Sequence, residues 1–545
     1  MTDHLQATEQ FDVIVVGSGA SGLSAALRAA ASGASVCIVE KGAYVGGTSA
    51  LSGGCMWIPQ NHYMHKLGIS DSREEVMTYI RAASPAEWGN VEEPLWQAFV
   101  DNAPEMLRFL EANTPMTFAV NRNCDPYAEL PGGKTMGRNV SARPFKLSRL
   151  GAWADKIRPP TIPQFLNYEE IVDGAVAANL RRAAIRFGLQ GAYRKMTGRR
   201  TMGGGLVAGL LSGCLSKGCD LRLETAAKRL IVAGDRIVGL EVEGKSGPAV
   251  LKARRGVVLA SGGFEWNAEM MARYQPGPVK WNGSPRTNTG DGHRMAEEVG
   301  AQLDRMDQAL IMPTLPTTYE GYAEHGRPAY DIVMPHSILV NRHGRRFTNE
   351  KQMNIGLCFS EVDPATGEPI NLPAWRIYDA QFMRKYPHMA PPAASPAVTT
   401  AQTLDELARK VGIDPAGLVE TVARFNPAAL RGEDPDFGRG SFPWDYLQGA
   451  DPWHKPNRTL GTVEQAPFYA VAFNRSYLGT KGGPRTNARA QVLRPDGSRI
   501  VGLYAAGNLM ANSFGTRAVG AGSTIGPCLT WGYIGGTNVI LEDAA

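Results

Sequence analysis

Short hydrophobic runs near the N-terminus alternate with a longer stretch that is rich in alanine and leucine. Residues 11–16 (Phe-Asp-Val-Ile-Val-Val) form an apolar run that predicts a buried parallel strand. Residues 21–32 predict a helix, and residues 35–39 (Ser-Val-Cys-Ile-Val) predict a second strand. A strand, a helix and a second strand in this order predict the first unit of an α/β domain with a parallel sheet.

Similar patterns recur far along the chain. Residues 256–264 form a short apolar strand that ends in glycines, and residues 293–300 predict a helix in which Asp291 either caps the start or supports a ligand. Residues 502–508 (Gly-Leu-Tyr-Ala-Ala-Gly-Asn) predict a strand and a turn, and residues 522–527 predict the start of a final helix. A late segment of this kind suggests a chain that returns to its first domain.

The loop between the first strand and its helix carries the pattern Gly-x-Gly-x-x-Gly. Gly17 permits a tight turn, Gly19 lets the backbone approach a pyrophosphate, and Gly22 allows close contact between helix and strand. The N-terminus of the helix presents free N–H groups to phosphates. Glu40 follows the second strand, where its carboxylate can accept hydrogen bonds from ribose hydroxyls. The spacing predicts a dinucleotide site.

The later segments indicate which dinucleotide this site binds. A chain that returns to its first domain to enclose a ring system predicts FAD, with the N-terminus of the final helix directed at the flavin edge that gains negative charge on reduction. No histidine lies in the glycine-rich loop of residues 46–54, so we expect the FAD to be non-covalent. The expected cofactor-binding residues are Gly17, Gly19, Ala20, Ser21, Gly22, Glu40, Lys41, Gly47, Thr48, Ser49, Ser52, Gly53, Gly54, Ser261, Gly262, Asp291, Gly507, Asn508, Gly522, Ser523, Thr524 and Ile525.

Composition excludes several other classes of protein. The chain has 545 residues and a net charge of +5, with one basic stretch at residues 181–200 that we interpret as a solvated helix face or an anion-binding rim rather than a nucleic-acid site. The seven cysteines form no Cys-x-x-Cys pair, and no metal site is expected. The polar N-terminus and the lack of a long apolar run predict a cytoplasmic protein without a membrane span.

At this point the chain resembles the fumarate reductase/succinate dehydrogenase-type flavoproteins, and within them the 3-ketosteroid Δ1-dehydrogenase-like branch. The resemblance rests on the glycine-rich segments already named, on residues 341–350 (Asn-Arg-His-Gly-Arg-Arg-Phe-Thr-Asn-Glu) and on residues 478–483 (Leu-Gly-Thr-Lys-Gly-Gly). It implies a Rossmann-like α/β FAD-binding domain at residues 1–308 and 476–545. An inserted α+β catalytic domain at residues 309–475 would cap the flavin.

The resemblance also implies a reaction, the removal of two hydrogens from a C–C bond beside a ketone. A donor polarises the carbonyl, a base takes the α-proton and flavin N5 accepts the β-hydride. In the ketosteroid enzymes a tyrosine and a glycine amide bind the carbonyl, a second tyrosine is the base and a third supports it. Here Gly522 matches the amide and Tyr127 the supporting tyrosine, but Ala518 and Asn354 stand at the other two positions.

An alanine cannot donate a hydrogen bond from its side chain, and an asparagine cannot act as a base. The candidates to supply the missing groups are Tyr127, Tyr477, Arg517 and Tyr330, together with the amide of Gly522, while Asn354 can still orient a substrate oxygen. Tyr477 precedes the segment where the inserted domain is expected to return, and Arg517 could polarise a carbonyl or bind a carboxylate.

Three functions remain open on the sequence. The first is an FAD-dependent dehydrogenase that introduces a C=C bond beside the carbonyl of a cyclic ketone, either a steroid or a smaller ring. The second is a fumarate or enoate reductase, and the third is a flavin electron carrier that desaturates nothing. The sequence does not identify the electron acceptor, for which a quinone, a soluble carrier and oxygen are alternatives, nor the oligomeric state.

Overall fold

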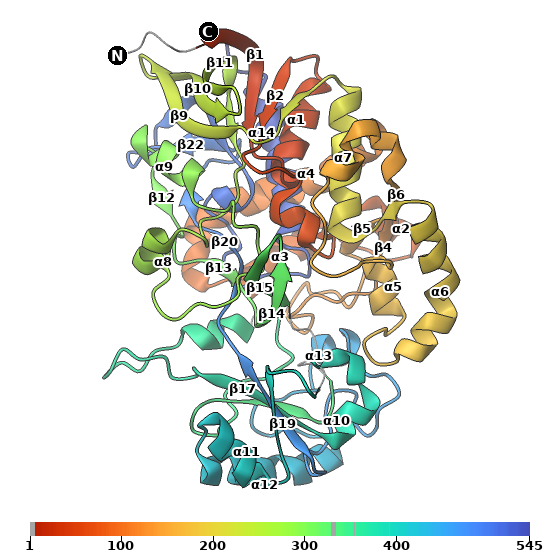
Figure 1. Ribbon diagram of the computed structural model, residues 1–545. Helices are drawn as coiled ribbons and strands as arrows, with labels where there is room; N and C mark the ends of the chain where they lie inside the picture. Colours follow the sequence, from red (N-terminus) through yellow and green to blue (C-terminus); the bar gives the residue numbers. More distant parts are fainter. Residues whose placement is uncertain (1–5, 329–333, 354, 392, 545) are drawn as a thin grey trace.

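The computed structural model describes residues 6–328, 334–353, 355–391 and 393–544. Figure 1 shows an upper body that contains both ends of the chain and a lower body that is formed by the middle of the chain. The predicted candidates Asn354 and Tyr330 lie outside the described residues.

An eight-stranded sheet forms the centre of the upper body. β8, β2, β1, β11 and β23 run parallel in this spatial order, and antiparallel strands complete the sheet. The predicted strands at residues 11–16 and 35–39 are confirmed as parts of β1 and β2. The strands are β1 (Gln6–Val16), β2 (Val36–Val39), β8 (Asp220–Arg222), β9 (Ala226–Ala233), β10 (Arg236–Gly244), β11 (Gly247–Leu259), β22 (Gln491–Leu493) and β23 (Arg499–Ala505).

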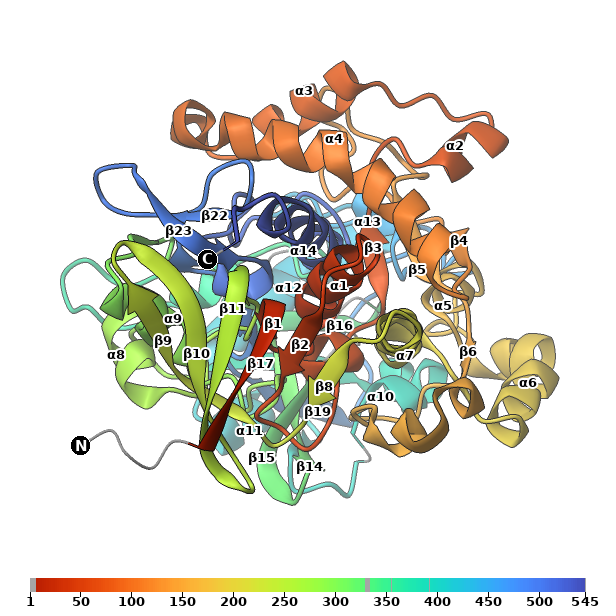
Figure 2. The same ribbon diagram turned by 90° about the horizontal axis from the view of Figure 1, so that it is seen from above.

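The first and last helices pack against each other beside this sheet. α1 (Ala20–Ala30) follows β1, and α14 (Ile525–Val539) is the predicted final helix. Gly532 and Gly536 of α14 face the α1 backbone so closely that a Cβ atom at either position would overlap a carbonyl oxygen of α1. These two glycines therefore let the C-terminal segment pack against the helix that begins at the dinucleotide loop. Figure 2 shows α1 and α14 side by side over the sheet.

Further helices and a small sheet surround the flank of α1 and α14 (Figure 2). The antiparallel strands β3 (Cys55–Trp57), β5 (Asn139–Ala142) and β4 (Phe118–Val120) form this sheet. The other elements on this flank are α2 (His62–Lys66), α3 (Arg73–Ala83), α4 (Gly89–Asn113), β6 (Phe145–Lys146), α5 (Tyr168–Asp173), α6 (Leu180–Met196), β7 (Arg199–Arg200) and α7 (Met202–Ser216). α8 (Ala268–Tyr274) and α9 (Asp291–Glu298) lie instead beside β9 (Figure 2).

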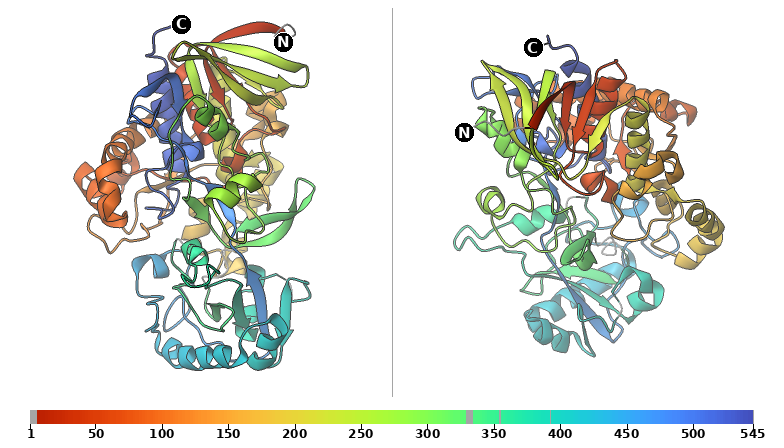
Figure 3. Two further views of the ribbon diagram at one scale, coloured as in Figure 1. Left: turned by 90° about the vertical axis from the view of Figure 1, so that its left-hand side faces the viewer. Right: turned by 45° about the horizontal axis from the view of Figure 1, so that its top comes forward.

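The lower body has its own antiparallel sheet of β16, β17, β19 and β18. Alternate residues of β16 enter different apolar clusters: Ile338 and Val340 pack with α11 and α12, whereas Leu339 packs with Phe382 of α10. Figure 3 shows this sheet and its helices below the upper body. The elements are β16 (Ser337–Val340), β17 (Ala374–Asp379), α10 (Ala380–Lys385), β18 (Val398–Ala401), α11 (Leu404–Val411), α12 (Pro415–Arg431), α13 (Pro443–Leu447) and β19 (Phe468–Phe473).

The chain passes between the two bodies through paired strands. On the way out, β12 (Leu303–Asp304) and β13 (Ala309–Ile311) pair with β21 (Gly483–Pro484) and β20 (Tyr477–Thr480), which lie on the way back. The hairpin of β14 (Thr314–Tyr319) and β15 (Tyr322–Pro328) follows β13. No helix within the described ranges is long and apolar enough to cross a membrane.

Candidate active site

The predicted dinucleotide loop is confirmed as a tight turn between β1 and α1. Gly17 has a φ of 104°, and a Cβ atom on it would lie 2.5 Å from the carbonyl oxygen of Ala260. A Cβ atom on Gly22 would overlap the carbonyl oxygen of Gly17. In contrast, the nearest atom to a Cβ on Gly19 would be Ser49 Oγ, at 3.6 Å. Gly19 therefore leaves open space at the start of α1, where a pyrophosphate can approach.

The carboxylate of Glu40 is buried and orders this loop. Its Oε2 accepts hydrogen bonds from Ser18 N (3.1 Å) and Ser18 Oγ (2.7 Å), and its Oε1 accepts one from Gly42 N (2.8 Å). Oε2 already accepts two hydrogen bonds, whereas Oε1 accepts one and has a second lone pair, through which Glu40 can accept from a ribose hydroxyl. A single cavity here is lined by five of the predicted residues, Gly17, Glu40, Lys41, Ser261 and Asp291. Thr225, Ala227 and Thr287, which the sequence patterns missed, also line it.

Asp291 does not cap α9, contrary to one of the two predicted roles. Gly290 occupies the N-cap position in a left-handed conformation, and Asp291 is the first residue of the helix. Its carboxylate accepts hydrogen bonds from Lys41 Nζ (2.6 Å) and Arg294 (2.9 Å). Burial is the largest single influence on Asp291 and opposes its ionisation. The hydrogen bond and charge of Lys41, together with hydrogen bonds from Arg294 and Thr289, outweigh burial and lower the pKa of the carboxyl group. This ion pair closes one end of the cavity.

The loop at residues 46–54 lies against the start of α1. Ser49 Oγ accepts a hydrogen bond from Ala20 N (3.0 Å), and Ser52 Oγ donates one to Ser49 O (2.7 Å). Asn288, which the sequence patterns did not identify, donates to Thr48 Oγ1 (3.1 Å) and to Glu265 (2.6 Å). The loop is therefore held at Ser49 by the start of α1 and at Thr48 by Asn288.

The C-terminal segment completes the cradle. A Cβ atom on Gly507 would collide with the hydroxyl of Ser21, so the turn before Asn508 packs directly on α1. Gly522 has a φ of 82°, and its amide nitrogen has no hydrogen-bond acceptor among the described residues. Ser523 Oγ is also buried without a partner within that part of the chain. Unpaired donors at the N-terminus of α14 fit the electron-rich edge of a flavin.

Tyr127 and Arg517, two of the predicted catalytic candidates, lie in contact with each other. The guanidinium of Arg517 lies 4.8 Å from the centre of the Tyr127 ring, a cation–π contact. Tyr127 is half-buried and Arg517 is exposed. Asp125 holds the turn before Tyr127, because its carboxylate accepts hydrogen bonds from Trp57 Nε1 (2.8 Å) and Arg138 (2.7 Å).

Tyr477 lies apart from this pair. It is fully buried in an apolar cluster with Phe264 and Met306, and its hydroxyl donates to Gln275 Oε1 at 3.0 Å. Burial raises the pKa of Tyr477 to about 12. These features favour a packing role for Tyr477 over an acid or base. Ala518 is buried.

Lys351, which the sequence patterns missed, lies three residues before Asn354. It is buried, and its Nζ donates to the carbonyl oxygen of Gln448. Burial lowers the pKa of Lys351 from 10.5 to about 7, although the charge of nearby Asp445 opposes this shift. Only the burial of its side chain identifies Lys351 as a candidate, because a lysine beside Glu350 belongs to no sequence motif.

Lys351 is connected through Gln448 and Tyr168 to the glycine-rich loop at residues 46–54, here called the flavin loop. Gln448 Nε2 donates to Tyr168 Oη at 3.4 Å, and the Tyr168 ring packs so closely on Gly53 that a Cβ atom there would lie 2.7 Å from Cδ2. Tyr168 packs with a small apolar cluster that includes Cys55, Cys124, Trp444 and Ala521. The apolar cluster thus lies between Lys351, the turn at Tyr127 and the start of α14.

A parallel sheet, a glycine turn at a helix N-terminus and a returning C-terminal helix with unpaired donors define a dinucleotide-binding flavoprotein. The FAD binding domain family matches residues 12–525, and the chain therefore belongs to this family.

Two relatives and one solved structure are similar over nearly the whole chain. The 3-oxosteroid 1-dehydrogenase of Mycolicibacterium smegmatis is 36% identical over 98% of both chains. The 4-oxocyclohexanecarboxylate 2-dehydrogenase of Sinomonas cyclohexanicum is 36% identical over 97% of this chain and 92% of its own. A crystal structure of 3-ketosteroid Δ1-dehydrogenase from Sterolibacterium denitrificans in complex with 1,4-androstadiene-3,17-dione has a TM-score of 0.90 at 33% identity, covering 98% of this chain and 100% of the other. The predicted resemblance is confirmed.

Proposed function

We propose that this protein is an FAD-dependent dehydrogenase that introduces a C=C bond between the α and β carbons of a cyclic ketone. One observation carries the proposal: over at least 97% of its length the chain matches relatives named as dehydrogenases of two different ring ketones, one steroidal and one monocyclic. The shared feature of those substrates is the ring ketone. Bound FAD supplies the hydride acceptor for the reaction.

We further propose that the FAD is non-covalent and that residues 309–475 form an inserted catalytic domain that caps it. The pairing of β13 with β20 supports these limits, because both crossings between the two bodies lie side by side there. The lower body also has its own sheet and its own apolar clusters. Residues 1–308 and 476–545 would then constitute the FAD-binding domain.

The proposed carbonyl site is the amide of Gly522. This N–H has no acceptor in the described part of the chain, and it lies three residues before the first residue of α14, where the helix dipole favours negative charge. A substrate carbonyl there would gain a hydrogen bond that strengthens as enolate charge develops. Arg517 lies above Tyr127 and can accept a carboxylate of a substrate such as an oxo-acid.

The proposed base is Lys351, in place of the absent tyrosine. A lysine whose pKa is lowered to about 7 is largely neutral above that pH and can accept an α-proton. The link from Lys351 through Gln448 to Tyr168, whose ring packs against Gly53, supports this role. Lys351 Nζ would accept the proton from the substrate α-carbon, and bound FAD would supply the acceptor for the β-hydride.

Anaerobic titration of the flavin-loaded protein tests the reaction. We expect a cyclic ketone to bleach the oxidised flavin absorption at about 450 nm and to be recovered with two hydrogens fewer. The panel comprises 3-ketosteroids, 4-oxocyclohexanecarboxylate, succinate and fumarate. If no ketone bleaches the flavin while fumarate or an enone reoxidises the chemically reduced flavin, the protein is a reductase. If neither occurs, the electron-carrier alternative stands.

The role of Lys351 has a separate readout, exchange of the substrate α-proton with deuterated solvent. We expect the wild type to catalyse this exchange, with a rate that rises through about pH 7, and Lys351→Met and Lys351→Arg to lose it at least 100-fold. If Lys351 instead bound a carboxylate as a cation, Lys351→Arg would retain activity. Lys217→Gln, at an exposed lysine, is the control.

A further inference from the structure

Helix α6 exposes a continuous apolar stripe to solvent. Ile185 is 87% exposed, Leu189 90% and Met196 86%, and Tyr193 lies between the last two on the same face. The spacing of these residues, four, four and three positions, keeps them on one side of the helix. Figures 1 and 2 show α6 at the outer edge of the molecule, beside α5 and away from the sheet. Isolated exposed apolar residues are ordinary, but a stripe of this length on one helix is not.

The charges on α6 are all of one sign. The sequence of the helix, Leu180–Met196, contains five arginine and lysine residues and no aspartate or glutamate. Arg194 is buried and forms an ion pair with Glu170. The other four, Arg181, Arg182, Arg186 and Lys195, are exposed and flank the apolar stripe. An apolar stripe between cations is the pattern of a helix that lies in the interface of an anionic membrane.

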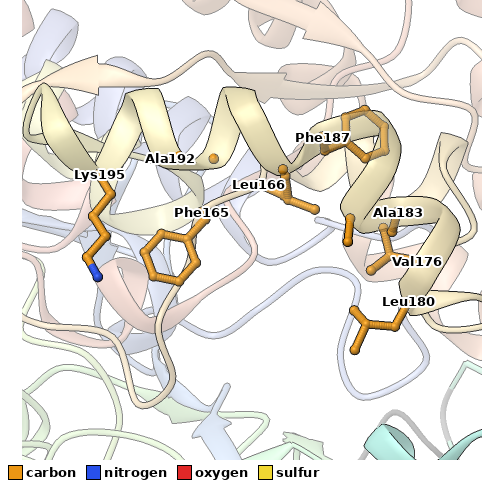
Figure 4. A pocket seen from close by; sticks show the side chains of 11 residues that line it. Phe165, Leu166, Val176, Leu180, Ala183, Phe187, Ala192 and Lys195 are labelled. Carbon is orange, nitrogen blue, oxygen red and sulfur yellow. The ribbon is translucent and has the colours of Figure 1, made fainter.

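An apolar groove runs along the inner side of the same helix (Figure 4). Phe165, Leu166, Val176 and Leu180 contribute to its wall together with Ala183 and Phe187, and Lys195 lies at one end. Phe165 and Leu180 are themselves partly exposed, at 43% and 48%. The groove therefore extends the apolar stripe towards the body of the protein.

We propose that α6 and the preceding loop bind the surface of an anionic lipid bilayer. A second copy of this chain is the other candidate to cover the stripe, but a two-fold contact would place Arg181, Arg182, Arg186 and Lys195 against the same four cations of the partner. A bilayer that contains anionic headgroups satisfies both the cations and the apolar side chains at once.

The position of the groove suggests a role for this surface in substrate entry, and this role rests on the proposed function. Phe165 and Leu166 line the groove, and Tyr168, two residues further on, packs against Gly53 of the flavin loop. The segment that faces the bilayer thus continues into the wall of the proposed active site. A ring ketone that partitions into lipid could pass along this apolar wall without crossing water.

Co-sedimentation of the flavin-loaded protein with vesicles tests the surface without any substrate. We expect binding to vesicles of 30% phosphatidylglycerol in phosphatidylcholine, weakened by added salt, and at least tenfold weaker binding to pure phosphatidylcholine. Ile185→Ser with Leu189→Ser, and separately Arg181→Gln with Arg186→Gln, should each weaken binding at least tenfold. The control is Leu430→Ser, at a 64% exposed leucine of α12, which should bind like the wild type.

Binding of both double variants at wild-type strength, or no preference for anionic vesicles, would overturn the proposal. So would a concentration-dependent dimer in solution that the Ile185/Leu189 variant abolishes, because a second copy would then occupy the stripe. The variants should still bleach fully with a water-soluble ketone, since all four side chains are exposed. Vesicle binding without ketone turnover would leave the surface standing and reject only the proposed function.

Discussion

Replacing Arg138 should destabilise the protein more than replacing any surface arginine, because Arg138 joins two buried carboxylates. Its guanidinium donates to Asp71 through Nε (3.1 Å) and Nη2 (2.7 Å), and to Asp125 through Nη1 (2.7 Å). All three side chains are 1% exposed. Arg138→Met keeps an unbranched apolar stem but removes the guanidinium, and so leaves both carboxylates without their cation.

The expected cost follows from what remains after the change. Removing one partner of a buried ion pair typically costs about 3–5 kcal/mol, since the other charge stays buried without compensation. Two carboxylates are affected here, but each keeps another donor, Gln60 N for Asp71 and Trp57 Nε1 for Asp125. We therefore expect a loss of about 4 kcal/mol in the free energy of unfolding rather than twice that value.

Urea unfolding followed by tryptophan fluorescence measures this loss, and the flavin absorption that remains after gel filtration measures the effect on the site. The matched control is Arg73→Met, which breaks the pair with Asp101, whose two side chains are 46% and 47% exposed. That change should cost less than about 1 kcal/mol. Equal losses for Arg138→Met and Arg73→Met would refute the reasoning that burial makes the difference.

Three further predictions concern the cofactor cradle and the proposed base. Gly22→Ala should abolish retention of FAD on gel filtration, because the new Cβ overlaps the Gly17 carbonyl oxygen, whereas Gly188→Ala, with open space around it, should retain FAD. Ser523→Ala should weaken FAD binding about fivefold, the worth of one hydrogen bond, and leave the unfolding of the FAD-free protein unchanged, since this buried hydroxyl has no partner in the described protein. Lys351→Met should stabilise the fold most at or below pH 7. The pKa of Lys351 in the folded protein, about 7, lies below its value in the unfolded chain, so the stability of the wild type rises with pH above 7. The gain in stability from Lys351→Met therefore shrinks by about 1.4 kcal/mol per pH unit above pH 7. A difference in urea stability between the two proteins that is independent of pH from 6 to 9 would contradict this.

The sequence alone determined the dinucleotide half of this protein. Gly17, Gly19 and Gly22 act within one turn and one helix start, so their spacing is enough to predict the geometry that the structure shows. The apolar runs that became β1 and β2 are likewise local patterns. The family resemblance extended this prediction to the whole chain, because its motifs are distributed from the first strand to the final helix.

Other features depend on segments that are far apart in the chain. Tyr477 looked like a candidate because of its place in the sequence, but burial beside Phe264 and a hydrogen bond to Gln275 made it part of a core. Lys351 belongs to no sequence motif, and it became a candidate only because the fold buries its side chain. Trp444, 93 positions away, donates a hydrogen bond to its carbonyl oxygen. Desolvation is a property of the folded surroundings, and no spacing of residues encodes it.

The stripe on α6 shows the same division. The sequence determined that residues 181–200 are basic and predicted a solvated helix face or an anion-binding rim there. Only the tertiary structure decided that Ile185 and Leu189 of this helix point away from every core, because the period of a helix does not say which of its faces meets the rest of the protein. Local geometry is encoded by neighbouring residues, whereas the burial of a residue, its exposure and the charged groups around it are decided when distant segments pack together.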